Sequence, residues 1–169
     1  MKSSRQTTVQ CIAVILALIT LLSCCSVGAF AAKKTPDAAY SAVKKAYGSS
    51  MPLSAKNRIT GKKRIMGVKT ADCESYFAAL KIKGGKNAQS EYAIFICKAK
   101  SKAKVKTIVA NLKTYLKNEQ QSMNNYLSPT GKKLFKNAKV GTVGQFVYLV
   151  MLDTAANKKA VNAINKTLK

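Results

Sequence analysis

Lysine is the commonest side chain in this sequence that can bind a charged partner or react. Of the 30 basic residues 27 are Lys, against only 6 acidic residues, so the formal net charge is +24. Lys carries a hydrated point charge on a flexible stem, whereas Arg offers the planar fork that bidentate recognition needs. The excess of Lys therefore predicts diffuse attraction to an anionic partner, with no specific reading of nucleic acid.

Catalytic and metal-binding side chains are scarce in the same sequence. It contains no His, which excludes a Ser-His-Asp triad and removes the commonest zinc ligand. Six acidic residues leave little for paired-carboxylate catalysis or for a calcium cage. A Ser-Lys dyad would need a Lys whose pKa is lowered by burial, and no motif marks one. We therefore expect a protein that is not an enzyme and that has neither metal nor cofactor.

Two groups of lysines are candidates for binding a polyanion. Residues 101–124 have the apolar period of a long helix, and a stripe of lysines lies beside the apolar stripe, within an arc of about 60° at 100° per residue. Two Gly-Lys-Lys segments lack the glycine pattern of a phosphate-binding loop, so we expect solvated turns there. The candidates are Lys102, Lys106, Lys113 and Lys117 on the helix, and Lys62, Lys63, Lys132 and Lys133 in the turns.

Cys73 and Cys97 are candidates for a disulfide in an oxidising compartment. They belong to two strands that we expect to form a hairpin turning on residues 84–86. A turn that sets Lys83 opposite Asn87 also sets the two cysteines opposite each other, and a slip of one residue removes the match. The alternative is two separate buried thiols, because cysteines in strands are commonly core residues.

The N-terminal segment has the order of a secretory signal peptide. Lys2 and Arg5 form a basic start, residues 11–22 are almost unbroken apolar, and small residues follow. The apolar stretch is about 12 residues long, short of the roughly 20 needed to span a bilayer, so an uncleaved anchor is the less favoured alternative. We expect export, with a signal peptide over residues 1–31 and a single domain over residues 32–169.

The same N-terminal segment is also compatible with lipidation of the mature chain. Residues 21–24 (LLSC) resemble a bacterial lipobox, in which the leader is cut before a cysteine that then carries a lipid. Cleavage there would remove residues 1–23 and anchor the chain through Cys24. Leu22 stands where a smaller residue is usual, and we favour free secretion while keeping lipid anchoring open.

The remaining sequence alternates helical and strand patterns. A Thr-Pro-Asp start at residues 35–37 predicts a helix that ends at Gly48. Glu119 projects onto the apolar side of the long helix, and we expect it to reach solvent near the helix end. Residues 91–98 are apolar on both faces, as in a central strand. Further strands are predicted at 64–69, 74–83, 138–143 and 146–152, the last two joined by a type II′ turn at Gly144-Gln145, and a final helix runs to Leu168.

This order of elements predicts an α+β domain. At 47% hydrophobic residues the chain can bury a core. The hairpins make a mainly antiparallel sheet of about five strands, and we expect amphipathic helices to cover one face of it. The sequence shows no internal repeat with a period of 20–50 residues and no linker to a second domain.

Several aromatic, Gly and Pro positions occur in a fixed order along the chain: Ala46-Tyr47-Gly48, the strand EYAIFICK at 91–98, Tyr126-Leu127-Ser128-Pro129 and Gly144-Gln145-Phe146-Val147-Tyr148. With the leader, this set resembles a family of small exported proteins and lipoproteins of Gram-positive bacteria that is known as a domain of unknown function. The resemblance covers roughly residues 40–153 and implies an extracytoplasmic address and an α+β fold, but no activity. This chain departs from the family by its high Lys content and its weak lipobox.

Charge and leader together suggest a role at the cell envelope. The polyanions outside a bacterial cell are phosphate-rich wall polymers and anionic lipid headgroups, whereas an exported protein seldom meets nucleic acid. We expect a non-enzymatic protein, secreted or lipid-anchored at the cell surface, that binds anionic wall polymer or a membrane surface through its lysines. The alternatives are a structural or protein-interaction module whose charge only keeps it soluble, with a partner that the sequence does not identify, and an envelope hydrolase that uses Ser and Lys.

Overall fold

A computed structural model describes residues 34–85 and 88–169 of the chain. The predicted signal peptide and the lipobox cysteine Cys24 lie outside the described residues. Among the described helices, none is long and apolar enough to cross a membrane. The helices are α2 (Pro36–Tyr47), α3 (Lys102–Ser122), α4 (Pro129–Asn137) and α5 (Thr154–Leu168), and the strands are β1 (Arg64–Ile65), β2 (Val68–Lys69), β3 (Cys73–Lys83), β4 (Ser90–Ala99), β5 (Lys139–Val143) and β6 (Phe146–Met151).

Four strands form an antiparallel sheet in the order β3-β4-β6-β5. It consists of two hairpins whose inner strands, β4 and β6, pair with each other. The predicted α+β class with a mainly antiparallel sheet is confirmed. The main sheet has four strands, close to the predicted count of about five. The segment predicted as one further strand at residues 64–69 folds back on itself as the separate β1–β2 hairpin. Its two turn residues, Met66 and Gly67, have φ of 49° and 77°, and a Met at positive φ is hard to foresee.

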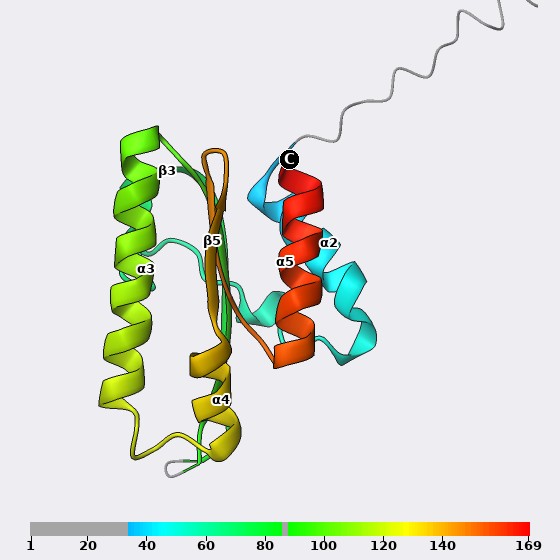
Figure 1. The fold of residues 1–169 in the computed structure, drawn as a ribbon, viewed down its shortest axis with the longest axis vertical. Coiled ribbons are helices and arrows are strands. Elements are labelled where there is room, and N and C mark those ends of the chain that lie inside the picture. The colour runs from blue at the N-terminus through cyan, green and yellow to red at the C-terminus, as the bar shows by residue number, and fades with distance from the viewer. Residues whose placement is uncertain (1–33, 86–87) are drawn as a thin grey trace, which may run out of the picture. The chain divides into compact units, whose positions relative to one another are not determined.

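Helices cover both faces of the sheet (Figure 1). α3 packs on one face against β4, β5 and β6, while α2 and α5 pack on the other face and against each other. The side chains of β4 alternate between the two cores: Phe95 contributes to the core under α3, and Ile94 and Ile96 contribute to the core under α2 and α5. The prediction of helices on one face is therefore wrong. A central strand that is apolar on both faces requires a covering layer on each.

Helix α4 has no counterpart in the sequence prediction, which placed a solvated turn at its Gly-Lys-Lys segment. Ser128 caps the helix, its Oγ accepting a hydrogen bond from the Gly131 N–H at 2.9 Å, and Pro129 occupies the first turn. Lys132 and Lys133 are exposed, but they lie on this helix and not in a turn. With nine residues, the helix is shorter than the roughly 11–18 residues over which a helical period is read from a sequence.

The first hairpin has a register that differs from the predicted one. Lys83 pairs with Ser90 in place of Asn87, so Cys73 does not lie directly opposite Cys97. The register also shifts at a bulge next to Cys73. A bulge turns the following side chains onto the other face, and as a result Cys73 and Cys97 share the core under α3.

The second hairpin and the helix starts follow the predictions. Gly144 has a φ of 57° at the first turn position, as a type II′ turn requires. The Oγ1 of Thr35 accepts a hydrogen bond from the Ala38 N–H at 3.1 Å and caps α2, and α5 begins after Asp153. These elements fix the ends of the two helical layers that carry the exposed lysines.

Candidate functional site

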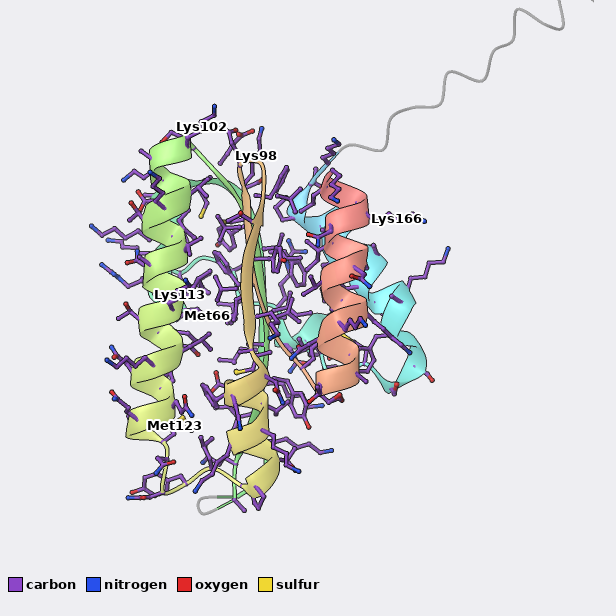
Figure 2. All side chains as sticks on the ribbon, viewed as in Figure 1. Met66, Lys98, Lys102, Lys113, Met123 and Lys166 are labelled. Carbon is purple, nitrogen blue, oxygen red and sulfur yellow. The ribbon has the colours of Figure 1, made fainter. Side chains whose placement is uncertain are left out.

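The longest row of candidate lysines lies on α3. Ser101 caps this helix, and the burial of Ile108 and Leu112 fixes which side faces the sheet. The rotation of 100° per residue then places the four predicted lysines on an outer flank, where all are exposed. From first to last the row extends about 22 Å at 1.5 Å per residue. We call Lys102, Lys106, Lys113 and Lys117 the α3 lysine row (Figure 2).

Few carboxylates oppose the positive charge of the chain. None of the α3 lysine row has a carboxylate oxygen within 4.0 Å among the described residues. The hydrogen bond from Lys104, on the same helix, holds the pKa of Asp72 below its ordinary value, which favours the ionised carboxylate. The ion pairs of the described residues are Arg58–Asp37 at 2.9 Å, Lys98–Glu74 at 2.8 Å and Lys104–Asp72 at 2.7 Å. The charge of the row is therefore available to an external anion.

The other predicted lysines lie on other elements. Lys62 and Lys63 are exposed in the loop before β1, and Lys132 and Lys133 are exposed on α4. Exposed lysines also lie on α2 and α5, the helical layer on the other face of the sheet, so the positive charge is spread over both helical layers (Figure 2). Those on the opposite layer include Lys44 and Lys45 on α2, and Lys158, Lys159 and Lys166 on α5.

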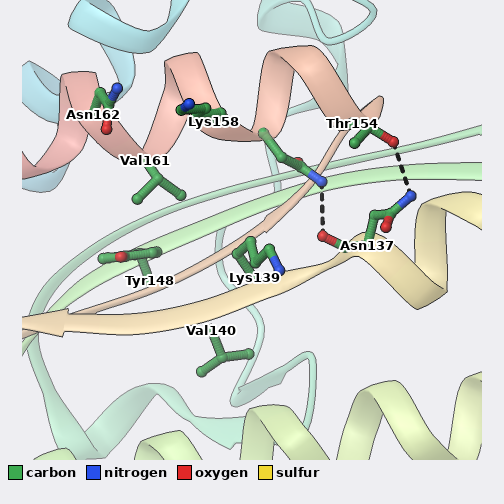
Figure 3. Close-up of a pocket in the computed structure, with 9 residues that line it drawn as sticks. Asn137, Lys139, Val140, Tyr148, Thr154, Lys158, Val161 and Asn162 are labelled. Atoms are coloured by element: carbon green, nitrogen blue, oxygen red, sulfur yellow. Dashed lines mark hydrogen bonds between the residues drawn. The ribbon is translucent and has the colours of Figure 1, made fainter.

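A cavity of about 430 Å³ opens between the β5–β6 hairpin and α5 (Figure 3). Lys139 comes from the strand side and Lys158 from the helix side, and no carboxylate lines it. Asn137 closes one end, donating a hydrogen bond from Nδ2 to the Thr154 Oγ1 at 2.8 Å. Two lysines among amide and hydroxyl groups make this cavity suitable for an anionic group.

A second cavity, of about 400 Å³, lies between the β1–β2 hairpin and α3, and we call it the carboxylate cavity. Glu91 of β4 lines it and is only 2% exposed, and its Oε1 accepts a hydrogen bond from the Tyr115 hydroxyl at 2.7 Å. Glu119, one helical turn beyond Tyr115 on α3, lines the same cavity. Burial raises the pKa of Glu91 against the opposing effect of the Tyr115 hydrogen bond, and the charge of Glu119 raises it further.

The sequence prediction did not single out Glu91, and it expected Glu119 to reach solvent. Glu119 is instead only partly exposed and faces the carboxylate cavity. Two signals were present: a carboxylate begins the one strand that is apolar on both faces, and a Tyr and a Glu stand four residues apart on the apolar side of a helix. Their meeting depends on how α3 docks on β4, which no local pattern encodes.

The two cysteines of the sheet are neighbouring thiols. Both are buried and free in the structure. The neighbouring Cys97 thiol lowers the pKa of Cys73, whereas the neighbouring Cys73 thiol and burial raise the pKa of Cys97. Cys73 is therefore the more readily ionised partner, and the thiolate is the form that oxidises.

We expect a disulfide between Cys73 and Cys97 under the oxidising conditions that export would bring, because the two cysteines lie in the same core cluster. The closed loop would add roughly 3 kcal/mol to the free energy of unfolding. Titration of the denatured, unreduced protein cleaved after Ala31 should find no thiol, and reduction should lower its melting temperature. The Cys73→Ser variant should show one thiol as a control. Two reactive thiols in the unreduced wild-type protein would contradict the bond.

Comparison with known proteins places the chain in a family. Neither a curated protein nor a solved structure matches it at significant similarity. Residues 49–152 match a family described as a domain of unknown function, DUF4358. The matched segment covers more than half of the chain and contains the whole main sheet, α3, α4, the α3 lysine row and the carboxylate cavity. The resemblance drawn from the aromatic, Gly and Pro positions is confirmed, and the chain belongs to the DUF4358 family.

Proposed function

We propose that this protein is exported and binds phosphate-bearing polyanions of the cell envelope through the α3 lysine row, without catalysing a reaction. The observation that carries the proposal is the row itself: four exposed lysines along one helix flank, with no carboxylate within 4.0 Å among the described residues. The net charge of +24 and the signal-like leader support it.

The spacing of the row suits a linear polyanion. Successive lysines stand one or two helical turns apart, which is about 6–11 Å at 1.5 Å per residue. The Debye length at physiological salt is about 8 Å, so neighbouring lysines act together on an anion that lies along the helix. Each Lys near an anionic membrane surface contributes about 1 kcal/mol, so the four together contribute about 4 kcal/mol, which corresponds to roughly millimolar affinity, and the other exposed lysines add to it.

The spread of lysines over both layers favours a second candidate function. Exposed lysines on α2 and α5, such as Lys166 in Figure 2, extend the charge to the layer opposite α3. An even spread of lysines is typical of a protein-interaction module. In such a module the charge serves only solubility, and the protein partner binds at a different surface. The two candidates differ in whether one face dominates the binding of anions.

Neutralising the α3 lysine row should weaken binding to purified wall fragments and to anionic vesicles. We expect the combined Lys→Gln variant at residues 102, 106, 113 and 117 to lose roughly a hundredfold or more in affinity at low salt, at about 1 kcal/mol per Lys. Wild-type binding should fall as sodium chloride rises. Cosedimentation measures both, and comparing wall fragments with vesicles tells polymer from lipid.

The matched control carries the same change in charge on the opposite layer. Lys44, Lys45, Lys159 and Lys166 are all exposed there, and Lys→Gln at these four should cost less than tenfold. Gln and Lys have similar helix propensity, so both variants should keep the fold, which circular dichroism checks. Equal losses of affinity in the two variants would show that α3 has no special role in binding. If the wild-type protein does not bind at low salt, the second candidate function, in which the charge only keeps the protein soluble, is favoured.

A further inference from the structure

We propose that the carboxylate cavity binds a small zwitterion with an apolar body, that is, a free apolar α-amino acid. This site is independent of the α3 lysine row, since it lies between the β1–β2 hairpin and α3 and uses other residues. Its volume of about 400 Å³ falls within the range of small-molecule sites. The lining divides into carboxylates, basic side chains and apolar side chains, and each part fits one part of such a ligand.

Two carboxylates, those of Glu91 and Glu119, line the site. Glu91 has one hydrogen-bond partner among the described side chains, the Tyr115 hydroxyl on its Oε1. No buried side-chain oxygen of the described residues lacks a partner, so the second oxygen of Glu91 is open to the cavity. Neither Glu91 nor Glu119 has a basic group within 4.0 Å among the described residues. A buried carboxylate beside a second, partly exposed one, with no cation near either, favours an incoming ammonium group, because pairing offsets the cost of burying the charge of Glu91.

The basic part of the lining lies apart from the carboxylates. Lys62 and Arg64 line the same cavity and are exposed. The Arg64 guanidinium donates a hydrogen bond to the Gly67 carbonyl at 3.2 Å, which holds it over the hairpin. Positive and negative groups that share a cavity without pairing with each other are complementary to a ligand that carries both charges on separate atoms. The carboxylate of an amino acid would bind Arg64 and Lys62.

The rest of the lining is apolar. Ile65 and Met66 of the hairpin are buried, and Leu80 and Ile82 of β3 and Met123 after α3 complete this side. Ile82 is 53% exposed, which leaves a large apolar side chain at the cavity in contact with water. Covering it with an aliphatic side chain of the ligand would remove that surface from water. The apolar lining therefore favours leucine or methionine over a polar amino acid.

The hairpin is held tightly over the cavity. A Cβ on Gly67 would lie 3.0 Å from the Asn111 carbonyl oxygen of α3, so the hairpin and the helix are in close contact. Met66, at the preceding position, has a φ of 49°, which is uncommon for Met. This close contact keeps Arg64 in place before a ligand arrives and lowers the ordering cost of binding.

Calorimetry with three probes tests the proposal on the mature chain. We expect L-leucine to bind saturably, and leucinamide, which lacks the carboxylate, and 4-methylpentanoate, which lacks the ammonium, to bind at least tenfold more weakly. Glu119→Gln and Glu91→Gln should each weaken leucine binding at least tenfold, and Gln at 91 retains an acceptor for Tyr115. Lys139→Gln, in the other cavity, is the control and should leave leucine binding unchanged.

Three outcomes would overturn the inference. Leucinamide binding as tightly as leucine would make the cavity a simple cation site, and 4-methylpentanoate binding as tightly would make it an anion site. No saturable heat with leucine at millimolar concentration, together with no shift of the Glu91 or Tyr115 resonances by NMR, would leave no amino-acid site at all. Leucine binding by the variant that lacks the α3 lysine row should be normal, so failure of this inference and failure of the polyanion proposal are distinguishable.

Discussion

Replacing Asn157 by alanine is expected to lower the free energy of unfolding by about 3 kcal/mol. The change leaves the buried Leu152 N–H and the partly buried Asn137 carbonyl without their hydrogen bonds, and each unpaired buried group costs about 1–3 kcal/mol. Asn157 is 2% exposed in the second turn of α5. Its Oδ1 accepts a hydrogen bond from the Leu152 N–H at 2.8 Å, and its Nδ2 donates one to the Asn137 carbonyl at 2.9 Å. One amide thus joins the end of β6, the end of α4 and the start of α5.

Urea unfolding followed by circular dichroism measures this loss. Asn162→Ala is the matched control, because Asn162 lies on the same helix but is exposed, and it should change stability by less than about 0.5 kcal/mol. A loss below about 1 kcal/mol for Asn157→Ala would show that water replaces the amide at both backbone groups. The variant also tests whether α5, which lies beyond the segment that matches the family, is held to the sheet mainly through this amide.

The elements that sequence reasoning recovered are those in which local signals agree. The long helix has a Ser cap, a sustained apolar period and a lysine stripe, and the structure begins it directly after Ser101. The second hairpin has a glycine at the one position that needs positive φ. In both cases capping or turn chemistry and periodicity point to the same boundary, so no tertiary information was needed.

The elements that it missed are those that tertiary contacts decide. The hairpin at residues 64–69 turns through a Met at positive φ, which propensity argues against. The register of the first hairpin depends on the length of its connection and on a bulge beside Cys73, and neither has a sequence signature. Because β4 is apolar on both sides, a helical layer must cover each face of the sheet. The sequence prediction recognised the apolar strand but placed helices on one face only.

The candidate sites divide in the same way. The α3 lysine row is a property of one helix, and its spacing alone defines it. The carboxylate cavity joins Glu91 of β4 with Tyr115 and Glu119 of α3, and it becomes visible only when the helix is docked on the sheet and the β1–β2 hairpin on the helix. A low count of acidic residues argued against paired carboxylates, but two of the six meet in this cavity.

The substitution Gly131→Ala is expected to destabilise the domain by about 3 kcal/mol, the upper part of the usual range for overpacking. Helix propensity alone predicts the opposite sign, a gain of about 1 kcal/mol for replacing Gly by Ala within a helix. Gly131 is buried in the first turn of α4, and a Cβ there would lie 2.3 Å from the Gln89 carbonyl oxygen. The close approach of two backbones therefore outweighs propensity.

The Gln89 carbonyl cannot move away from the added methyl group without breaking other bonds. It accepts hydrogen bonds from the Ser128 N–H at 2.9 Å and from the Ser128 Oγ at 3.0 Å, and the Gln89 N–H donates to the Tyr126 carbonyl at 2.8 Å. Gly85→Ala is the control, because a Cβ at Gly85 would meet no atom within 4 Å, and it should be neutral or slightly stabilising. Chemical unfolding of both variants decides the sign. A gain in stability for Gly131→Ala would mean that α4 can shift off Gln89 without loss, and that the serine cap does not lock the two segments together.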